Sequence, residues 1–191
     1  MTMGVLTGCL VVDLSILVQG PQTGAMLHDL GADVVKVELP EVGDLGRWLT
    51  VAVDDDRSPY VEANNRGKRS VALDLRTPGG KRALFKLVEN ADVLIHNFVP
   101  GTAEEWGIDY TDFREINPRL VYAAGSTFGP EGPNSRREGA DMVGQAGAIR
   151  TPGDILHPSD DIPTAQARNT NTNLLSPVPS AYASLPPQSL R

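Results

Sequence analysis

Residues 8–38 read GCLVVDLSILVQGPQTGAMLHDLGADVVKVE, in which two short apolar runs flank a helix-like segment. The runs at residues 10–14 and 33–38 are largely apolar, as strands covered on both faces of a parallel sheet are. Residues 21–30 suit one helix, and Gly31 follows them where a left-handed C-terminal cap is usual. The stretch therefore predicts a strand, a helix and a second strand that runs parallel to the first.

The same alternation recurs as far as about residue 127. Further strands are predicted at residues 71–75, 92–98 and 120–126, and further helices at residues 79–90 and 110–116. Such a recurrence is typical of βαβ units. The sequence therefore predicts an α/β fold, with a parallel sheet and flanking helices.

The composition changes near residue 151. Seven of the 15 prolines fall in residues 151–191, together with many serine, threonine and asparagine residues. Such a segment cannot bury enough apolar surface to offset the entropy lost on ordering. Residues 158–191 are therefore predicted to be a disordered tail.

Charge and cysteine content exclude several classes of function. A net charge of -7 argues against a nucleic-acid partner, because phosphate backbones attract basic surfaces. Cys9 is the only cysteine, which rules out an internal disulfide and a cysteine-based metal cluster, and its apolar surroundings favour a packing thiol over a nucleophile. The sequence has neither an apolar run of about 20 residues nor a signal-like start, so we expect a cytoplasmic protein with no membrane partner.

Three cations lie within four residues just before the strand predicted at residues 71–75. Arg66, Lys68 and Arg69 surround a glycine, and Arg76 follows the same strand. A ligand that carries phosphate groups would find donors there. The alternative is a solvated basic turn, since charge clusters are commonly surface features.

Polar and aromatic residues also occur at the ends of two other predicted strands. Asn97 and Phe98 could hydrogen-bond and stack on a planar heterocycle, because ligands of parallel sheets lie beyond the carboxyl ends of the strands. The alternative is an ordinary strand end, in which His96 is a core histidine and not a catalyst. The loop at residues 15–20 precedes a helix N-terminus that could hold an anionic group, or it is a simple strand-to-helix turn.

Several motifs occur in a fixed order: GCLVVDLS, LGADVVKVE, NRGKRSVALDL, ADVLIHNFVPG, NPRLVY and GPEGP. In this order they resemble family III CoA-transferases, which include formyl-CoA and carnitine-CoA transferases and the related methylacyl-CoA racemases. The resemblance covers residues 6–150. It implies a Rossmann-like CoA-binding domain there, a smaller second domain, and two ring-shaped chains interlocked as a homodimer.

The resemblance also implies a binding site for CoA or acyl-CoA as a substrate, with no permanently bound cofactor and no metal. The implied CoA-binding residues are Val18, Gln19, Glu38, Leu73, Arg76, Asn97 and Phe98, and the cations Arg66, Lys68 and Arg69 would meet the CoA phosphates. Two positions depart from the family pattern. Leu39 stands where formyl-CoA transferases often have arginine, and Gln19 lies one place later than the family's active-site glutamine.

In these transferases an aspartate attacks the acyl-CoA thioester, and CoA then passes to a carboxylic acid through an aspartyl-CoA thioester. The segment where that aspartate is expected, residues 157–173, reads HPSDDIPTAQARNTNTN and lacks the small-residue helix that follows it in the family. We therefore expect a truncated chain. Asp141 is the candidate catalytic residue, and its alternative role is to cap a helix at residues 142–146.

Two other functions stay open. One is an acyl-CoA racemase fragment, although a two-base racemase needs a histidine partner and residues 99–156 contain none. The other is a CoA-binding remnant without catalytic activity.

Overall fold

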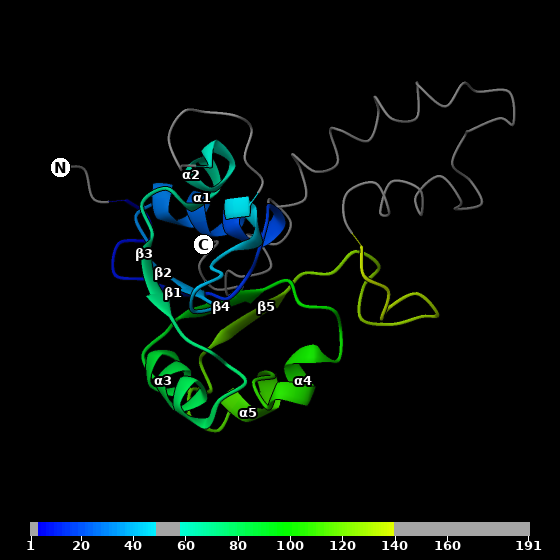
Figure 1. Cartoon of the computed structure of the whole chain (residues 1–191). Coiled ribbons are helices and arrows are strands. Elements are labelled where there is room, and N and C mark those ends of the chain that lie inside the picture. Colours follow the sequence, from blue (N-terminus) through cyan, green and yellow to red (C-terminus); the bar gives the residue numbers. More distant parts are fainter. Residues whose placement is uncertain (1–3, 49–57, 140–191) are drawn as a thin grey trace, which may run out of the picture.

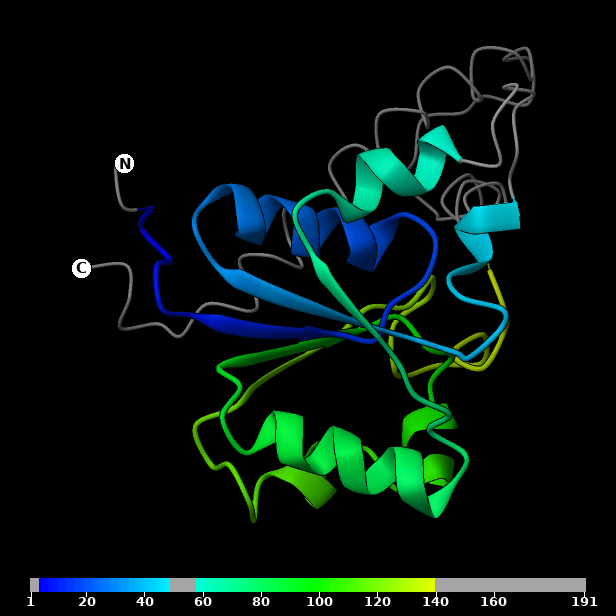
Figure 2. The same cartoon turned by 60° about the vertical axis from the view of Figure 1, so that its left-hand side comes forward.

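The computed structural model describes residues 4–48 and 58–139. These residues form a sheet of five parallel strands with helices on both faces, as Figures 1 and 2 show. The α/β prediction is therefore confirmed. The predicted tail at residues 158–191 lies outside the described residues, and so does Asp141 with the helix expected at residues 142–146.

Five strands and five α-helices make up the described fold. The strands are β1 (Leu10–Asp13), β2 (Asp33–Glu38), β3 (Arg69–Ala72), β4 (Val93–His96) and β5 (Val121–Ala124). The helices are α1 (Gln19–Asp29), α2 (Pro59–Asn65), α3 (Pro78–Val88), α4 (Thr102–Trp106) and α5 (Tyr110–Phe113), with a 3₁₀ turn at Leu45–Trp48. None of the helices in the described ranges is long and apolar enough to cross a membrane.

The sheet order is β3-β2-β1-β4-β5, which is the order of the Rossmann-like folds. The chain leaves the central strand β1 toward β2 and β3 and then crosses back to β4 on the other side. Adjacent loops after β1 and β4 therefore diverge at the carboxyl edge of the sheet. Ligands of such sheets bind in the crevice that this divergence opens.

Each face of the sheet has its own apolar core, because successive strand residues point to opposite faces. Helices α1 and α2 cover one face, and α3, α4 and α5 cover the other (Figure 2). Val11 and Leu27 belong to the core under α1, whereas Val12, Leu84 and Phe113 belong to the core under α3 and α5. Cys9 packs half-buried against the core under α1, and burial raises the pKa of its thiol, which disfavours the reactive thiolate.

The strand predicted at residues 71–75 is displaced: β3 spans Arg69–Ala72. It is an edge strand, so it tolerates the exposed residues Arg69 and Ser70, and its pairing ends where Glu38 of β2 pairs with Ala72. Residues 73–75 consequently leave the sheet. Helices α2 and α4 were not predicted, because each is short and buries only one residue, Val61 and Ala103 respectively.

Candidate functional site

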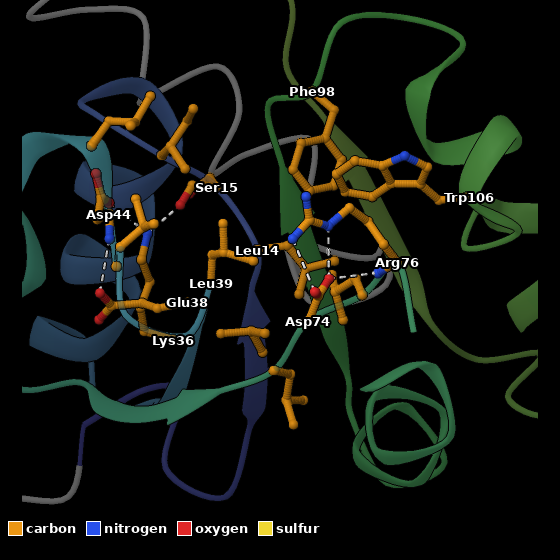
Figure 3. Close-up of a pocket in the computed structure, with 17 residues that line it drawn as sticks. Leu14, Ser15, Lys36, Glu38, Leu39, Asp44, Asp74, Arg76, Phe98 and Trp106 are labelled. Carbon is orange, nitrogen blue, oxygen red and sulfur yellow. Dashed lines mark hydrogen bonds and ion pairs between the residues drawn. The ribbon is translucent and has the colours of Figure 1, made fainter. Parts of the chain in front are cut away.

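A pocket of about 330 Å³ lies at the carboxyl ends of the strands. Its lining comes from the loops after β1, β2, β3 and β4 and from the end of α4. The lining residues are 14–16, 36–39, 42–45, 73–76, Phe98 and Trp106. Figure 3 shows Phe98, Trp106 and Arg76 on one side of the pocket, and Lys36, Glu38 and Asp44 on the other.

Four of the implied CoA-binding residues meet in this pocket: Glu38, Leu73, Arg76 and Phe98. Glu38 ends β2, and the other three follow β3 or β4. They converge because parallel strands end at one edge of the sheet. Glu38 and Phe98, the first and last of the four, are 60 residues apart in the chain, so only the fold brings them together.

One wall of the pocket is aromatic. The ring centroids of Phe98 and Trp106 lie 5.4 Å apart at an interplanar angle of 57°. Such tilted pairs present a flat apolar face on which a planar group can stack. Trp106 was not among the predicted site residues, because nothing in the sequence GTAEEW indicates that a one-turn helix carries it back to the pocket.

The carboxylate of Glu38 is engaged by protein groups. It accepts hydrogen bonds from Arg47, from the backbone N–H of Asp44 and from the hydroxyl of Ser70. Burial alone would raise the pKa of Glu38, but these bonds and the Arg47 charge outweigh burial and lower it to about 2. Glu38 is therefore a fixed anion that holds the loop of residues 39–47 against the pocket.

Arg76 is the cation on the aromatic side of the pocket. Its Nε and NH2 groups donate to the two carboxylate oxygens of Asp74, each at 2.9 Å. These hydrogen bonds hold the pKa of Asp74 below its ordinary value and raise that of Arg76. The guanidinium thus faces the pocket with part of its charge already compensated.

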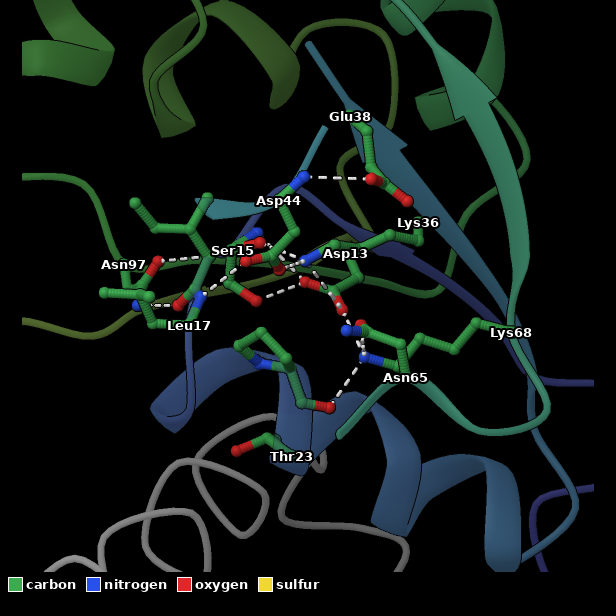
Figure 4. Close-up of polar contacts among 12 residues, drawn as sticks. Asp13, Ser15, Leu17, Thr23, Lys36, Glu38, Asp44, Asn65, Lys68 and Asn97 are labelled. Carbon is green, nitrogen blue, oxygen red and sulfur yellow. Dashed lines mark hydrogen bonds and ion pairs between the residues drawn. The ribbon is translucent and has the colours of Figure 1, made fainter. Parts of the chain in front are cut away.

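A cluster of buried charges lies beneath the other side of the pocket (Figure 4). The Nζ of Lys36 lies 2.9 Å from Asp44 Oδ2 and 3.9 Å from Asp13 Oδ2, and it also donates to the carbonyl of Ser15. The Nζ of Lys68 donates to Asp13 Oδ2 at 2.8 Å. We call Asp13, Lys36, Asp44 and Lys68 the buried charge cluster, and all four side chains are at most 2% exposed.

The buried charge cluster ties three loops together. Lys68 Nζ donates to the carbonyl of Pro21 at 2.6 Å, and Asp44 Oδ1 accepts the backbone N–H of Leu17 at 3.0 Å. Burial alone would raise the pKa of Asp13, but Lys36 and Lys68 outweigh it and lower that pKa. Sequence reasoning missed this cluster, although a lysine inside the apolar strand DVVKVE was a signal, since an unpaired buried lysine is strongly unfavourable.

The loop before α1 is held by Asn97. Its Oδ1 accepts the N–H of Ile16 and its Nδ2 donates to the carbonyl of the same residue, both at 2.8 Å. Val18 precedes α1 as its N-terminal cap position, and Gln19 is the first residue of the helix. Asn97, Val18 and Gln19 therefore border this loop, and they do not line the pocket.

The predicted basic segment does not face the pocket. Arg66 forms an ion pair with Asp29 of α1, and Arg69 forms one with Asp33 of β2. Lys68 forms an ion pair with Asp13 in the buried charge cluster. The three cations therefore point to three different places, and none of them lines the pocket.

Residues 6–151 match the protein family described as CoA-transferase family III. Among curated relatives, the succinate--glutarate CoA-transferase of Agrobacterium fabrum is 41% identical over 146 residues, which cover 73% of this chain and 36% of the relative. A probable fatty acyl-CoA transferase of Mycobacterium tuberculosis is 42% identical over 151 residues, which cover 78% of this chain and 38% of the relative.

Two crystal structures are also similar. That of the Mycobacterium tuberculosis protein has a TM-score of 0.76 and 37% identity, and the match covers 91% of this chain and 49% of that one. That of a CAIB/BAIF family protein from Brucella suis has a TM-score of 0.73 and 39% identity, with 93% and 48% covered. The chain therefore spans between about a third and a half of the length of the proteins that it matches.

Proposed function

The chain belongs to CoA-transferase family III, and we propose that it carries the CoA-binding part of an enzyme that moves CoA between an acyl-CoA thioester and a carboxylic acid. Residues 6–150 would form this CoA-binding domain. The observation that carries the proposal is the pocket in which Glu38, Leu73, Arg76 and Phe98 meet.

The pocket suits the two chemical parts of a nucleotide-like ligand. Phe98 and Trp106 offer an apolar face to an adenine ring, which would stack there. Arg76 is placed beside that face to meet a phosphate group with its guanidinium. Leu39 and Leu73 would contact the apolar parts of the ligand, so that one cation and several apolar side chains share the recognition.

The proposed reaction is nucleophilic catalysis by an aspartate. The carboxylate oxygen attacks the thioester carbonyl and CoA leaves as a thiolate. The aspartate and the acyl group are then joined in a mixed anhydride. The thiolate then attacks the aspartyl carbonyl and releases the first acid, so that an aspartyl-CoA thioester remains. The second acid takes CoA by the reverse of these steps. The nucleophile belongs to the segment at residues 157–173, whose sequence lacks the small-residue helix of the family, and Asp141 is the candidate catalytic residue upstream of it. The active species would be the interlocked homodimer.

Calorimetric titration with CoA and with 3′-dephospho-CoA, at low and at high salt, tests the binding proposal. We expect a dissociation constant on the order of 0.1 mM or weaker, because half of a cleft leaves the entropic costs of binding poorly offset. Phe98→Ala and Arg76→Ala should weaken it, and salt should weaken it through the phosphate contacts. Binding that ignores salt and both substitutions would remove the site from these residues.

A separate assay tests the chemistry. Formyl-, succinyl- and oxalyl-CoA are offered with several carboxylic acids to the wild-type chain and to Asp141→Asn. We expect no CoA transfer, because the sequence of residues 157–173 lacks the helix that follows the family's nucleophile. Transfer that this substitution abolishes would overturn that placement and make Asp141 the nucleophile. Transfer that persists unchanged would exclude it.

A further inference from the structure

His96 is a buried histidine that the proposed reaction does not use. It ends β4, is 6% exposed and does not line the pocket itself. Its Nδ1 accepts the backbone N–H of Phe98 at 3.2 Å, and its ring stacks on the Phe98 ring with centroids 5.0 Å apart at 29°. The ring of Tyr122 lies 5.0 Å away at 59°. His96 thus contacts both the backbone and the ring of Phe98.

The hydrogen bond in which a side chain accepts the backbone N–H two residues later recurs at the pocket. Asp13 Oδ1 accepts the N–H of Ser15 at 2.9 Å at the end of β1, and Asp74 Oδ1 accepts the N–H of Arg76 at 3.0 Å after β3. Ser15 and Arg76 line the pocket, as Phe98 does. After each of three strands, the N–H of a pocket residue is therefore held by the same short-range bond, which is the local bond that Asp and Asn side chains typically make.

The protonation state of His96 allows Nδ1 to accept the Phe98 N–H. Burial lowers the pKa of His96 to about 4, although the charge of Glu104 opposes burial. The ring is therefore neutral near pH 7, and with Nδ1 as the acceptor its proton is assigned to Nε2. Among the described residues Nε2 has no hydrogen-bond partner. Within that part of the chain, the hydrogen bonding of this ring is directed at Phe98 alone.

We propose that His96 is a positioning residue for CoA recognition, which fixes Phe98 as the aromatic wall of the pocket by a hydrogen bond to its backbone and by stacking on its ring. The proposal rests on the proposed function, because it assigns His96 a share of the CoA affinity. It acts only through Phe98 and touches no ligand atom.

Two substitutions separate the two contacts. In His96→Asn the Oδ1 is bonded to Cγ, as Nδ1 is in histidine, so the Phe98 N–H keeps an acceptor while the stacked ring is lost. His96→Phe keeps a ring on Phe98 and removes the acceptor. Amide hydrogen exchange of Phe98 in the full chain, followed by NMR, reports on the hydrogen bond without any ligand.

We expect slow exchange of the Phe98 amide in the wild type and in His96→Asn, and fast exchange in His96→Phe. Exchange in the wild type as fast as that of an open amide would overturn the proposal without recourse to a variant. The result therefore stands even where a variant fails to fold.

A double-mutant cycle measures the share in ligand binding. His96→Phe should weaken CoA binding about fivefold, the factor expected for the loss of one hydrogen bond. In a Phe98→Ala background the same change should have no further effect, because the residue through which His96 acts is gone. Equal weakening in both backgrounds would overturn the positioning role. Failure of the wild type to bind CoA would count against the proposed function, while the exchange of Phe98 would still decide whether His96 holds it.

Discussion

Glu38 and Arg47 form a two-pronged ion pair: Arg47 Nε donates to Glu38 Oε2 and Arg47 NH2 donates to Glu38 Oε1, both at 2.8 Å. Glu38 ends β2, and Arg47 lies in the 3₁₀ turn that closes the following loop. The pair therefore closes a loop whose residues Leu39, Val42 and Leu45 line the pocket. Charge-assisted bonds of this geometry are among the stronger hydrogen bonds in proteins.

The first prediction concerns pH and Glu38. Its pKa falls from 4.5 to about 2 on folding, so its stabilising contribution is complete above about pH 4.5 and is lost as the pH falls toward 2. Glu38→Gln should lower the free energy of unfolding by about 1–2 kcal/mol near neutral pH, discounted for partial solvent access. Urea denaturation of both proteins between neutral pH and pH 3 measures the difference.

The difference between wild type and Glu38→Gln should shrink as the pH falls below about 4.5, because Glu38 of the unfolded wild type takes up a proton there while that of the folded protein stays ionised down to about pH 2. Glu41→Gln is the matched control, since Glu41 is an exposed glutamate of the same loop. A difference that stays constant over the whole pH range would mean that the charge of Glu38 contributes nothing.

The buried strands were the predictable part of the fold. Residues 33–38 were predicted as a strand and form β2 with the same bounds, because a central strand of a parallel sheet is apolar on both faces. The edge strand β3 was misplaced, since its residues Arg69 and Ser70 are exposed and carry no apolar pattern. Strand ends also indicated part of the pocket lining, because Glu38 is the last residue of β2 and Phe98 lies two residues after the end of β4.

Long-range partners were the unpredictable part of the site. Lys68 was predicted as a phosphate donor, yet its partner Asp13 lies 55 residues earlier in the chain, and the two side chains meet only in the folded protein. Trp106 was missed for the same reason, because its place at the pocket depends on how α4 packs after β4. A residue type indicates which chemistry is available, whereas the fold decides which charged groups are already paired within the protein.

The second prediction concerns the buried charge cluster. Lys36→Met removes the cation between Asp13 and Asp44 and leaves buried carboxylates without a full set of partners. We expect a loss of about 3–5 kcal/mol in the free energy of unfolding, the usual cost of breaking a buried ion pair from one side. Urea denaturation at neutral pH measures it.

The matched control is Arg69→Met, which breaks an exposed ion pair with Asp33. That change should cost no more than about 1 kcal/mol. Equal losses from Lys36→Met and Arg69→Met would show that the buried charge cluster is no more stabilising than a surface pair.

The third prediction concerns the charge available to a ligand. Asp74→Asn should strengthen CoA binding about two- to threefold at low salt and steepen its salt dependence, because no carboxylate would then compensate the charge of Arg76. The Oδ1 of asparagine can still accept the Arg76 N–H, so the turn is retained. Calorimetry at several salt concentrations measures both effects.

Asp29→Asn is the control for Asp74→Asn. It frees Arg66, which lies outside the pocket, and should leave CoA binding unchanged. Weaker CoA binding by Asp74→Asn would mean that Asp74 contributes by orienting the Arg76 side chain, and that this outweighs its compensation of the Arg76 charge.

The fourth prediction concerns the C-terminal residues 158–191. Their composition, rich in proline, serine, threonine and asparagine, led to the prediction that they add nothing to the core. Removal of these residues should therefore leave the midpoint of thermal unfolding unchanged. A large drop in the midpoint would refute this prediction, and the match to CoA-transferase family III, which ends at residue 151, would not be affected.

The last prediction uses Trp106 as a reporter of the pocket. The chain has two tryptophans, and Trp48 is 68% exposed and outside the pocket lining, whereas Trp106 lines the pocket beside Phe98. Trp48→Phe therefore leaves a single tryptophan at the site. Stacking of adenine near that indole should change its emission as CoA is added, and the titration should follow the calorimetric dissociation constant.

The reverse substitution, Trp106→Phe, keeps an aromatic wall and leaves Trp48 as the only emitter, so CoA should then produce no specific change. The two variants share the same ligand, the same optical absorption by adenine and the same fold, and any difference between them comes from the position of the indole. If both variants respond equally, or if calorimetry detects binding that Trp106 does not sense, CoA binds away from the Phe98 wall. That result would also remove the ligand-binding role of His96, because a residue that holds Phe98 can influence CoA only where Phe98 meets it.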